Sequence, residues 1–163
     1  QMDYRPNVDA ATWFVSHVLP DLRAEHPGLC FAVVGRAPTP AVRALAGDGV
    51  IVTGAVPDVR GWLAAASVCV APLQIARGIQ NKVLEAMAMA TPVVVSPQAL
   101  EGIAAEPGRE LLLASDAAGF ADAVARLLAR TGNDMGLAAR ARVEHHYNWP
   151  SNLACIGEKL ECS

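Results

Sequence analysis

The 163-residue sequence lacks the features that mark several large classes of protein. It has no uninterrupted apolar run of about 18 residues, the length that a membrane-spanning helix needs, so we expect no transmembrane segment. The first residues, Gln1–Asn7, do not show the charged region followed by an apolar region that is typical of a signal peptide. The net charge is −3 with no block of basic residues, which argues against a nucleic-acid-binding groove.

The cysteines are few, and their spacing is not that of a metal site. Cys30, Cys69, Cys155 and Cys162 show no CxxC pair, and no cluster of carboxylates or histidines offers a metal site instead. Cys30 and Cys69 fall in apolar runs that we predict to be buried strands, where cysteine acts as a small inert hydrophobic residue. This usage is typical of a reduced, cytoplasmic protein, and a chain on the inner face of the cytoplasmic membrane would have the same pattern.

What the sequence does contain is apolar material, 53% of its residues against 18% charged, enough for one domain over residues 1–163 with a sizeable core. Five short runs are continuously apolar rather than alternating, which predicts parallel strands covered on both faces. These runs are Cys30–Val34, Val50–Thr53, Val68–Ala71, Pro92–Ser96 and Glu110–Leu113.

Helical patterns lie between the predicted strands, and the first of them precedes every strand. The predicted helices are Asn7–Ala24 with Asn7 as its N-cap, Pro38–Ala46, Asp58–Ala66, Ile79–Ala90, Asp116–Ala129, Asn133–His145 and Ser151–Leu160. The alternation predicts a doubly wound α/β domain with a mostly parallel, Rossmann-like sheet, whose ligand site lies beyond the carboxyl ends of the strands. Because such domains normally open with a strand, we expect a sheet that either lacks its first, central strand or fills that place with another chain.

The stretch Ala71–Ser96 carries the clearest functional pattern. Asn81, Lys82 and Glu85 share one face of a helix that is otherwise almost entirely apolar. Gly78 lies at the predicted helix start, where free N–H groups and the helix dipole favour an anion. This arrangement suits a nucleoside diphosphate, with the phosphates at the helix start and the ribose hydroxyls on the carboxylate. The alternative is a plain i,i+3 ion pair on a partly exposed face, worth a few tenths of a kcal/mol.

The span Val50–Val95 resembles the donor-binding, C-terminal half of GT-B-fold retaining glycosyltransferases of the group 1, family 4 type. The segment GIQNKVLEAMA followed by TPVV carries this resemblance, which extends from about Asn7 to Tyr147. The ARGIQNK stretch is most similar to bacterial sugar transferases of exopolysaccharide or lipid-linked glycan synthesis. The resemblance implies that residues 1–163 are a fragment of a two-domain enzyme without its N-terminal acceptor domain, and are inactive alone.

The reaction implied is transfer of a sugar from a nucleoside diphosphate sugar to a glycan or lipid-linked acceptor, with retention and without a metal or further cofactor. In the family, the glutamate of the Glu-Ala-Met-Ala sequence holds the ribose, a role that falls here to Glu85. Lys82 is the expected cation on the departing diphosphate. Arg77 stands where many members carry a glutamate near the donor sugar, and its guanidinium suits the diphosphate or another acidic group instead.

The remaining expected donor contacts come from four places in the chain. They are Gly78, Ile79, Gln80 and Asn81 at the helix start, Arg5 for the phosphates, the backbone of Ala55 and Val56 for the base, and Glu101 for the donor sugar. The same fold would also fit a nucleotide-sugar epimerase, although this half shows few acid or base residues for one. A non-catalytic α/β interaction module fits the fold as well, and a homodimer would complete the sheet if its first strand is absent.

Overall fold

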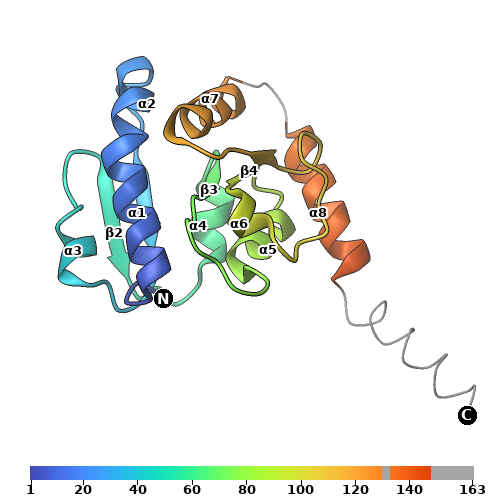
Figure 1. The fold of residues 1–163 in the computed structure, drawn as a ribbon, viewed down its shortest axis with the longest axis horizontal. Helices are drawn as coiled ribbons and strands as arrows, with labels where there is room; N and C mark the ends of the chain where they lie inside the picture. Colours follow the sequence, from blue (N-terminus) through green and yellow to red (C-terminus); the bar gives the residue numbers. More distant parts are fainter. Residues whose placement is uncertain (130–132, 148–163) are drawn as a thin grey trace, which may run out of the picture.

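Helices and parallel strands alternate along the chain in the computed structural model, which describes residues 1–129 and 133–147 (Figure 1). The strands are β1 (Phe31–Val34), β2 (Val50–Gly54), β3 (Cys69–Ala71), β4 (Val93–Val95) and β5 (Leu112–Leu113). The helices are α1 (Arg5–His17), α2 (Leu19–Glu25), α3 (Pro40–Arg43), α4 (Arg60–Ala65), α5 (Asn81–Ala88), α6 (Pro97–Leu100), α7 (Ala117–Leu128) and α8 (Asp134–His146). The predicted α/β class with parallel strands is confirmed, and the predicted helix Ser151–Leu160 lies outside the described residues.

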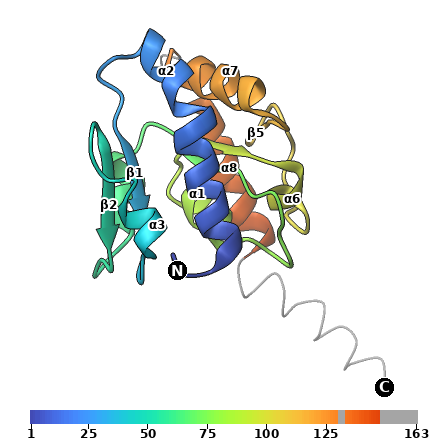
Figure 2. The ribbon, with the colours of Figure 1, turned by 60° about the vertical axis from the view of Figure 1, so that its left-hand side comes forward.

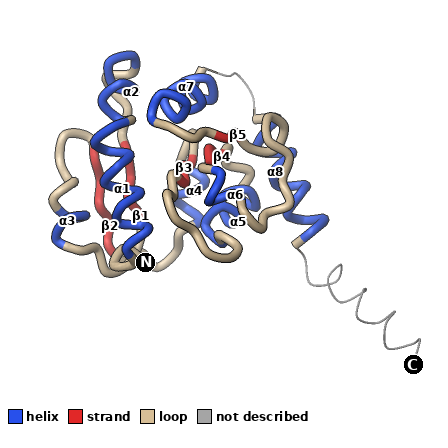
Figure 3. Tube along the Cα trace, in the orientation of Figure 1, coloured by secondary structure: helices blue, strands red, loops and turns tan. Residues whose placement is uncertain are grey.

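The strands form two parallel sheets rather than the single sheet that we expected. One sheet holds β1 and β2, and the other holds β3, β4 and β5 in that order (Figure 3). In the part of the chain that the structure describes, no strand pairs with the second edge of β1 or of β3. The division therefore falls at the place where the sequence predicts a central strand to be lacking.

Helix α1 connects the two sheets through its buried residues. It runs beside β1 and β2 (Figures 1 and 2), and the ring of its Phe14 stacks on Phe31 of β1 with centroids 4.7 Å apart. Phe14 belongs to one apolar cluster of buried residues. Ala10 belongs to a second, with residues of β3, β4 and α5, and Ala11 belongs to a third, with Val33 of β1. The apolar positions of this one helix thus reach both sheets.

The first predicted helix, Asn7–Ala24, is two helices with an earlier start. Pro20 has no N–H to donate to Ser16, and its ring crowds the preceding turn, so α1 ends at His17 and α2 begins at Leu19. The N-cap is Tyr4 rather than Asn7, since Pro6 fits the first turn of a helix and carries the start to Arg5. Asn7 therefore lies inside the first turn.

Burial differs between the two sheets. All three residues of β4 are buried, as expected for a central parallel strand, whereas Ala32 of β1 and Ile51 of β2 are exposed. Other parts of the protein thus cover both faces of β4, whereas β1 and β2 each have one residue exposed to solvent. Cys30 precedes β1 and is exposed, so its predicted burial is wrong, while burial raises the pKa of the Cys69 thiol in β3 to about 11.

None of the helices in residues 1–129 and 133–147 combines the length and the apolar character needed to cross a membrane.

Candidate functional site

The segment before α5 presents a run of backbone N–H groups. The helix begins at Asn81, two residues later than predicted, because its N-cap Gln80 has an extended backbone (φ −87°, ψ 91°). In the loop before it, Gly78 adopts a positive φ of 67°. The side-chain Nε2 of Gln80 donates to the carbonyl of Gly78 at 3.0 Å. Among the described residues, the backbone N–H groups from Gly78 to Lys82 donate to no protein acceptor. These groups are available to an anion or to water.

The polar face predicted for this helix is the face it presents to solvent. Asn81, Lys82 and Glu85 are exposed, and Val83 and Met87 on the other side are buried. The helix is therefore half-buried rather than enclosed on all sides. Glu85 makes no ion pair within the described residues, so its carboxylate is accessible one turn beyond the helix start.

Lys82 reaches across the molecule to helix α1. Its amine donates a hydrogen bond to the side-chain oxygen of Asn7, 75 residues away in the sequence. Lys82 retains exposed surface, yet desolvation of its amine lowers the pKa of Lys82 below the ordinary lysine value. Within residues 1–129 and 133–147 no carboxylate pairs with it, so the i,i+3 pair with Glu85 that we considered does not form.

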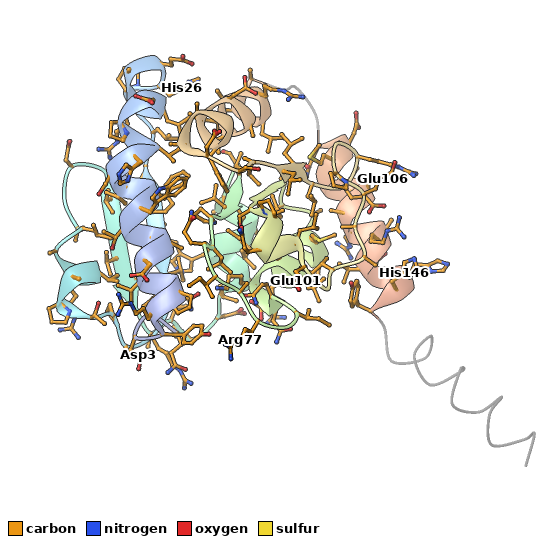
Figure 4. The ribbon with its side chains drawn as sticks, in the orientation of Figure 1. Asp3, His26, Arg77, Glu101, Glu106 and His146 are labelled. Carbon is orange, nitrogen blue, oxygen red and sulfur yellow. The ribbon has the colours of Figure 1, made fainter. Side chains whose placement is uncertain are left out.

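The loops at the carboxyl ends of β3 and β4 hold the segment before α5 in place. The hydroxyl of Ser96, which follows β4, donates to the carbonyl of Leu73 at 2.6 Å. A Cβ added to Gly102 would lie 3.6 Å from Cγ1 of Ile79, so the Glu101–Gly102 turn lies against the start of α5. Glu101 is exposed there, and Figure 4 shows it at the same end of the molecule as Arg77.

The two arginines expected at this site are in different situations. Arg77 is exposed and forms no ion pair with any described residue. Arg5 is exposed on α1, where its Nε lies 3.4 Å from the carboxylate of Asp9 one turn later. A pair of this kind contributes little and leaves Arg5 free to turn toward a stronger anion.

The predicted base contacts follow strand β2. Ala55 lines a shallow hollow of about 480 Å³ at the end of β2, together with Gly54 and residues of the α3 region, and Val56 is partly buried beyond it. Neither Lys82 nor Glu85 lines this hollow. In the described ranges, no group of three or more His, Cys, Asp or Glu residues could hold a metal ion.

Asn7 is the residue of this site that the sequence did not identify. It was predicted as a helix cap, and its contact with Lys82 depends on how α1 lies beside α5. The one signal in the sequence was its place two residues after Arg5, which we expected to contact the phosphates. Position along the chain gave no indication that the two residues meet.

The chain is similar to known glycosyltransferases. A family model described as glycosyl transferases group 1 matches residues 1–130. In fold, the chain resembles the structure of sucrose-phosphate synthase from Thermosynechococcus elongatus, with a TM-score of 0.72 and 24% sequence identity. The similarity covers 94% of this chain and 42% of the synthase chain, so this chain spans less than half the length of that protein. No curated protein matches the chain in sequence.

Proposed function

The chain belongs to the family of glycosyl transferases group 1, and on this premise we propose that residues 1–163 form the nucleotide-sugar-binding, C-terminal half of a retaining, metal-independent GT-B glycosyltransferase. The observation that carries the proposal is the start of α5. There a desolvated ammonium without a carboxylate partner among the described residues lies beside unused N–H groups, with the carboxylate of Glu85 one turn further on.

The phosphate end of the donor fits the start of the helix. Lys82 supplies a positive charge, and the N–H groups of Gly78, Ile79 and Gln80 supply neutral donors that bond to no acceptor among the described residues. Arg77, which has no ion-pair partner among the described residues, adds a second cation in the same loop. A nucleoside diphosphate carries the matching negative charge.

The ribose end of the donor fits Glu85. Residues three apart on a helix are neighbours, about 5–6 Å between their Cβ atoms, so a ligand held at Lys82 lies within reach of Glu85. An exposed carboxylate accepts hydrogen bonds from two adjacent hydroxyl groups. Asn81, on the same face, and Glu101, in the turn against Ile79, complete the surface that the donor would contact.

The chemistry follows from this charge distribution. The bond between the anomeric carbon and the phosphate oxygen breaks and its electron pair leaves on the diphosphate. The carbon bonds to an acceptor hydroxyl, whose proton passes to the departing diphosphate. Lys82, Arg77 and the N–H groups stabilise the negative charge on the departing diphosphate, a type of interaction that usually supplies much of an enzyme's rate. The acceptor that we propose is a glycan or lipid-linked glycan of bacterial polysaccharide synthesis, met at or near the inner face of the cytoplasmic membrane.

A second domain is part of the proposal, because this chain spans 42% of the synthase it resembles. An N-terminal acceptor domain would bring the acceptor hydroxyl to the edge where α5 begins. A strand that links it to Gln1 would pair with the edges of β1 and β3 that no described strand occupies. Met2 already donates to the carbonyl of Arg36 at 2.8 Å, just beyond β1. A homodimer that fills the same place is the alternative.

The test is a thermal-shift panel of UDP, GDP, ADP and TDP with the full-length protein. One ligand should stabilise it by about 2.7 kcal/mol at about a hundredfold excess over Kd. Glu85→Ala and Lys82→Ala should lose that shift, whereas Glu25→Ala should keep it. Glu25 is an exposed residue of α2 beside His26, and Figure 4 shows His26 at the opposite end of the molecule from Arg77.

The competing functions give different results in the same panel. An interaction module without a ligand predicts no shift with any diphosphate. An epimerase predicts nucleotide binding together with conversion of the donor sugar in the absence of an acceptor. Release of the diphosphate only when a glycan acceptor is present distinguishes the transferase from both.

A further inference from the structure

We propose that Asn7 is a positioning residue, which holds the ammonium group of Lys82 at the start of α5 in the orientation that meets the diphosphate. This inference rests on the proposed function and adds a residue to its site. Asn7 lies in the first turn of α1, in a different part of the chain from every donor-binding residue of α5.

Both ends of the Asn7 side chain are in use. Its Nδ2 donates to the carbonyl oxygen of Gln1 at 2.7 Å, and its Oδ1 accepts from the amine of Lys82. Because a carboxamide has one donor end and one acceptor end, the bond to Gln1 fixes the oxygen toward Lys82. An aspartate could not make the same pair of contacts, since an ionised carboxylate has no hydrogen to donate.

The anchor of Asn7 is itself held by the protein. The backbone N–H of Met2, next to Gln1, donates to the carbonyl of Arg36 at 2.8 Å, and the N–H of Thr39 donates to the carbonyl of Met2 at 3.3 Å. The segment that carries the Gln1 carbonyl is thereby tied to the loop after β1. Through Asn7, Lys82 of the β3–β5 side is connected to the β1–β2 side of the molecule.

The neutrality of Asn7 matters as much as its position. An amide oxygen orients an ammonium group without cancelling its charge, so the charge stays available to an incoming anion. A lysine side chain has several rotatable bonds, and fixing them before the ligand arrives removes an ordering cost from binding. The bond to Asn7 therefore makes the site ready for phosphate while leaving it cationic.

No charged side chain of the described residues bonds to the Lys82 amine, whose acceptor is the neutral Asn7. The charged residues on the surrounding elements come from three regions. They are Asp3, Arg5 and Asp9 before and in the first turns of α1, Arg36 after β1, and Arg77, Glu85 and Glu101 around the start of α5. Arg5 pairs with Asp9, and Arg36 donates to the side chain of Gln1. Desolvation is therefore what lowers the pKa of Lys82.

The experiment measures binding of inorganic pyrophosphate and of the four nucleoside diphosphates to the full-length protein, for Asn7→Ala, Lys82→Ala and the double variant. We expect Asn7→Ala to weaken binding about tenfold, the effect of losing one ordinary hydrogen bond. We expect no further loss when Asn7→Ala is added to Lys82→Ala, because Asn7 acts through the lysine. Additive losses in the double variant would overturn the proposal.

A second readout separates positioning from a merely structural role. We expect Asn7→Ala to move the alkaline limb of pyrophosphate binding to lower pH, because the ammonium loses an acceptor that favours its charged form. Asn7→Asp, nearly the same in shape, should move that limb to higher pH and still weaken binding, because its carboxylate competes with the ligand. A 13C titration of the Lys82 side chain, assigned with Lys82→Ala, reports the same two shifts without any ligand.

The outcomes distinguish this inference from the function on which it rests. If the unchanged protein binds a diphosphate and Lys82→Ala weakens it, but neither Asn7 variant changes affinity or the Lys82 titration, the positioning role is wrong and the donor site stands. If the unchanged protein binds none of the probes, the donor site is wrong and the role of Asn7 falls with it.

Discussion

Glu110 is a buried carboxylate that ties the β5 region to helix α8. It is 4% exposed, and its two oxygens share the one N–H at Nε of Arg142, at 3.0 and 2.9 Å. Its Oε2 also accepts from the backbone N–H of Glu106 at 2.8 Å. Burial alone would raise its pKa. The bonds from Arg142 and Glu106, with the charges of Arg142 and Arg109, hold the pKa of Glu110 below its usual value.

We expect Glu110→Gln to destabilise the protein by about 1–3 kcal/mol at neutral pH, because it leaves a partly buried arginine without its ion pair. Since the pKa of Glu110 is lower in the folded state, its contribution is present above the unfolded pKa and is lost as the pH falls through the folded pKa. Urea unfolding at pH 7 and well below about pH 4 should show the difference shrinking in acid. Asp122→Asn is the control, because Asp122 forms an exposed ion pair with Arg126 at 3.8 Å. We expect it to change the free energy of unfolding by no more than about 0.5 kcal/mol.

The two described cysteines should differ in their rate of alkylation. Cys30 is exposed, whereas burial raises the pKa of Cys69 to about 11, so few Cys69 thiolates exist at pH 8. We expect an iodoacetamide time course followed by mass spectrometry to show Cys30 modified at least about tenfold faster than Cys69. Equal rates would mean that β3 opens readily to solvent.

For single residues, the sequence predicted which side chains form the site better than it predicted which residues they contact. The shared face of Asn81, Lys82 and Glu85 follows from helical periodicity alone, and the structure places all three on the exposed side of α5. The bond from Lys82 to Asn7 spans 75 residues and depends on the packing of α1, which no local pattern describes. Cys30 was placed inside a strand because it opens an apolar run, but pairing begins one residue later at Phe31.

Helices α5 and α8 pack so closely that one position accepts no side chain. A Cβ on Gly136 of α8 would lie 1.9 Å from the carbonyl oxygen of Ala90, just beyond α5. Ala90 has a positive φ of 56°, and its carbonyl also accepts a hydrogen bond from the side chain of Asn133 at 2.7 Å. The contact is between backbones, so neither partner can simply rotate away.

We expect Gly136→Ala to destabilise the protein by about 1–3 kcal/mol, although alanine is the better helix former. The matched control is Gly61→Ala in α4, where an added Cβ would meet nothing within 4 Å. That change should stabilise by about 0.5–1 kcal/mol through the lower entropy of the unfolded chain. Urea denaturation measures both, and a stabilising Gly136→Ala would show that the two helices can separate at little cost.

The order and type of most described elements followed from the sequence, while their ends did not, and the short helix α6 was not predicted. Asp116 was a correct helix start, because its carboxylate accepts from the N–H of Gly119 at 2.8 Å as an N-cap does. The expected helix Pro38–Ala46 is only Pro40–Arg43, capped by Thr39. Prolines moved several other boundaries, since Pro6 extends α1 backward and Pro20 divides it from α2.

Across the whole molecule, the two sheets leave strand edges whose peptide groups lack partners among the described residues. In β3 the N–H of Cys69 donates to Pro92 at 2.8 Å and the carbonyl of Ala71 accepts from Ser96 at 3.2 Å, so both residues bond on the β4 side. The peptide groups of Val70 between them face the other way, because bonding alternates along a parallel strand. The α/β class followed from the sequence, but the division into two sheets depends on which strands find neighbours.

Hydrogen exchange of the full-length protein tests what covers this edge. If a strand from the linking segment pairs with β3, the amide of Val70 should be protected like that of Cys69, and dilution should not change its rate. If a second copy fills the place, the protection of Val70 should fall on dilution while that of Cys69 does not. A Val70 amide that exchanges freely at every concentration would contradict both forms of the proposal.

Helix α1 contributes Phe14, Ala10 and Ala11 to three separate apolar clusters. If α1 unfolded, both sheets would lose apolar contacts at once. We therefore expect neither sheet to stay folded when the other unfolds. The cooperative unit of this protein is therefore larger than either of its sheets. A single calorimetric transition, with equal van't Hoff and calorimetric enthalpies, is the expected signature of that coupling.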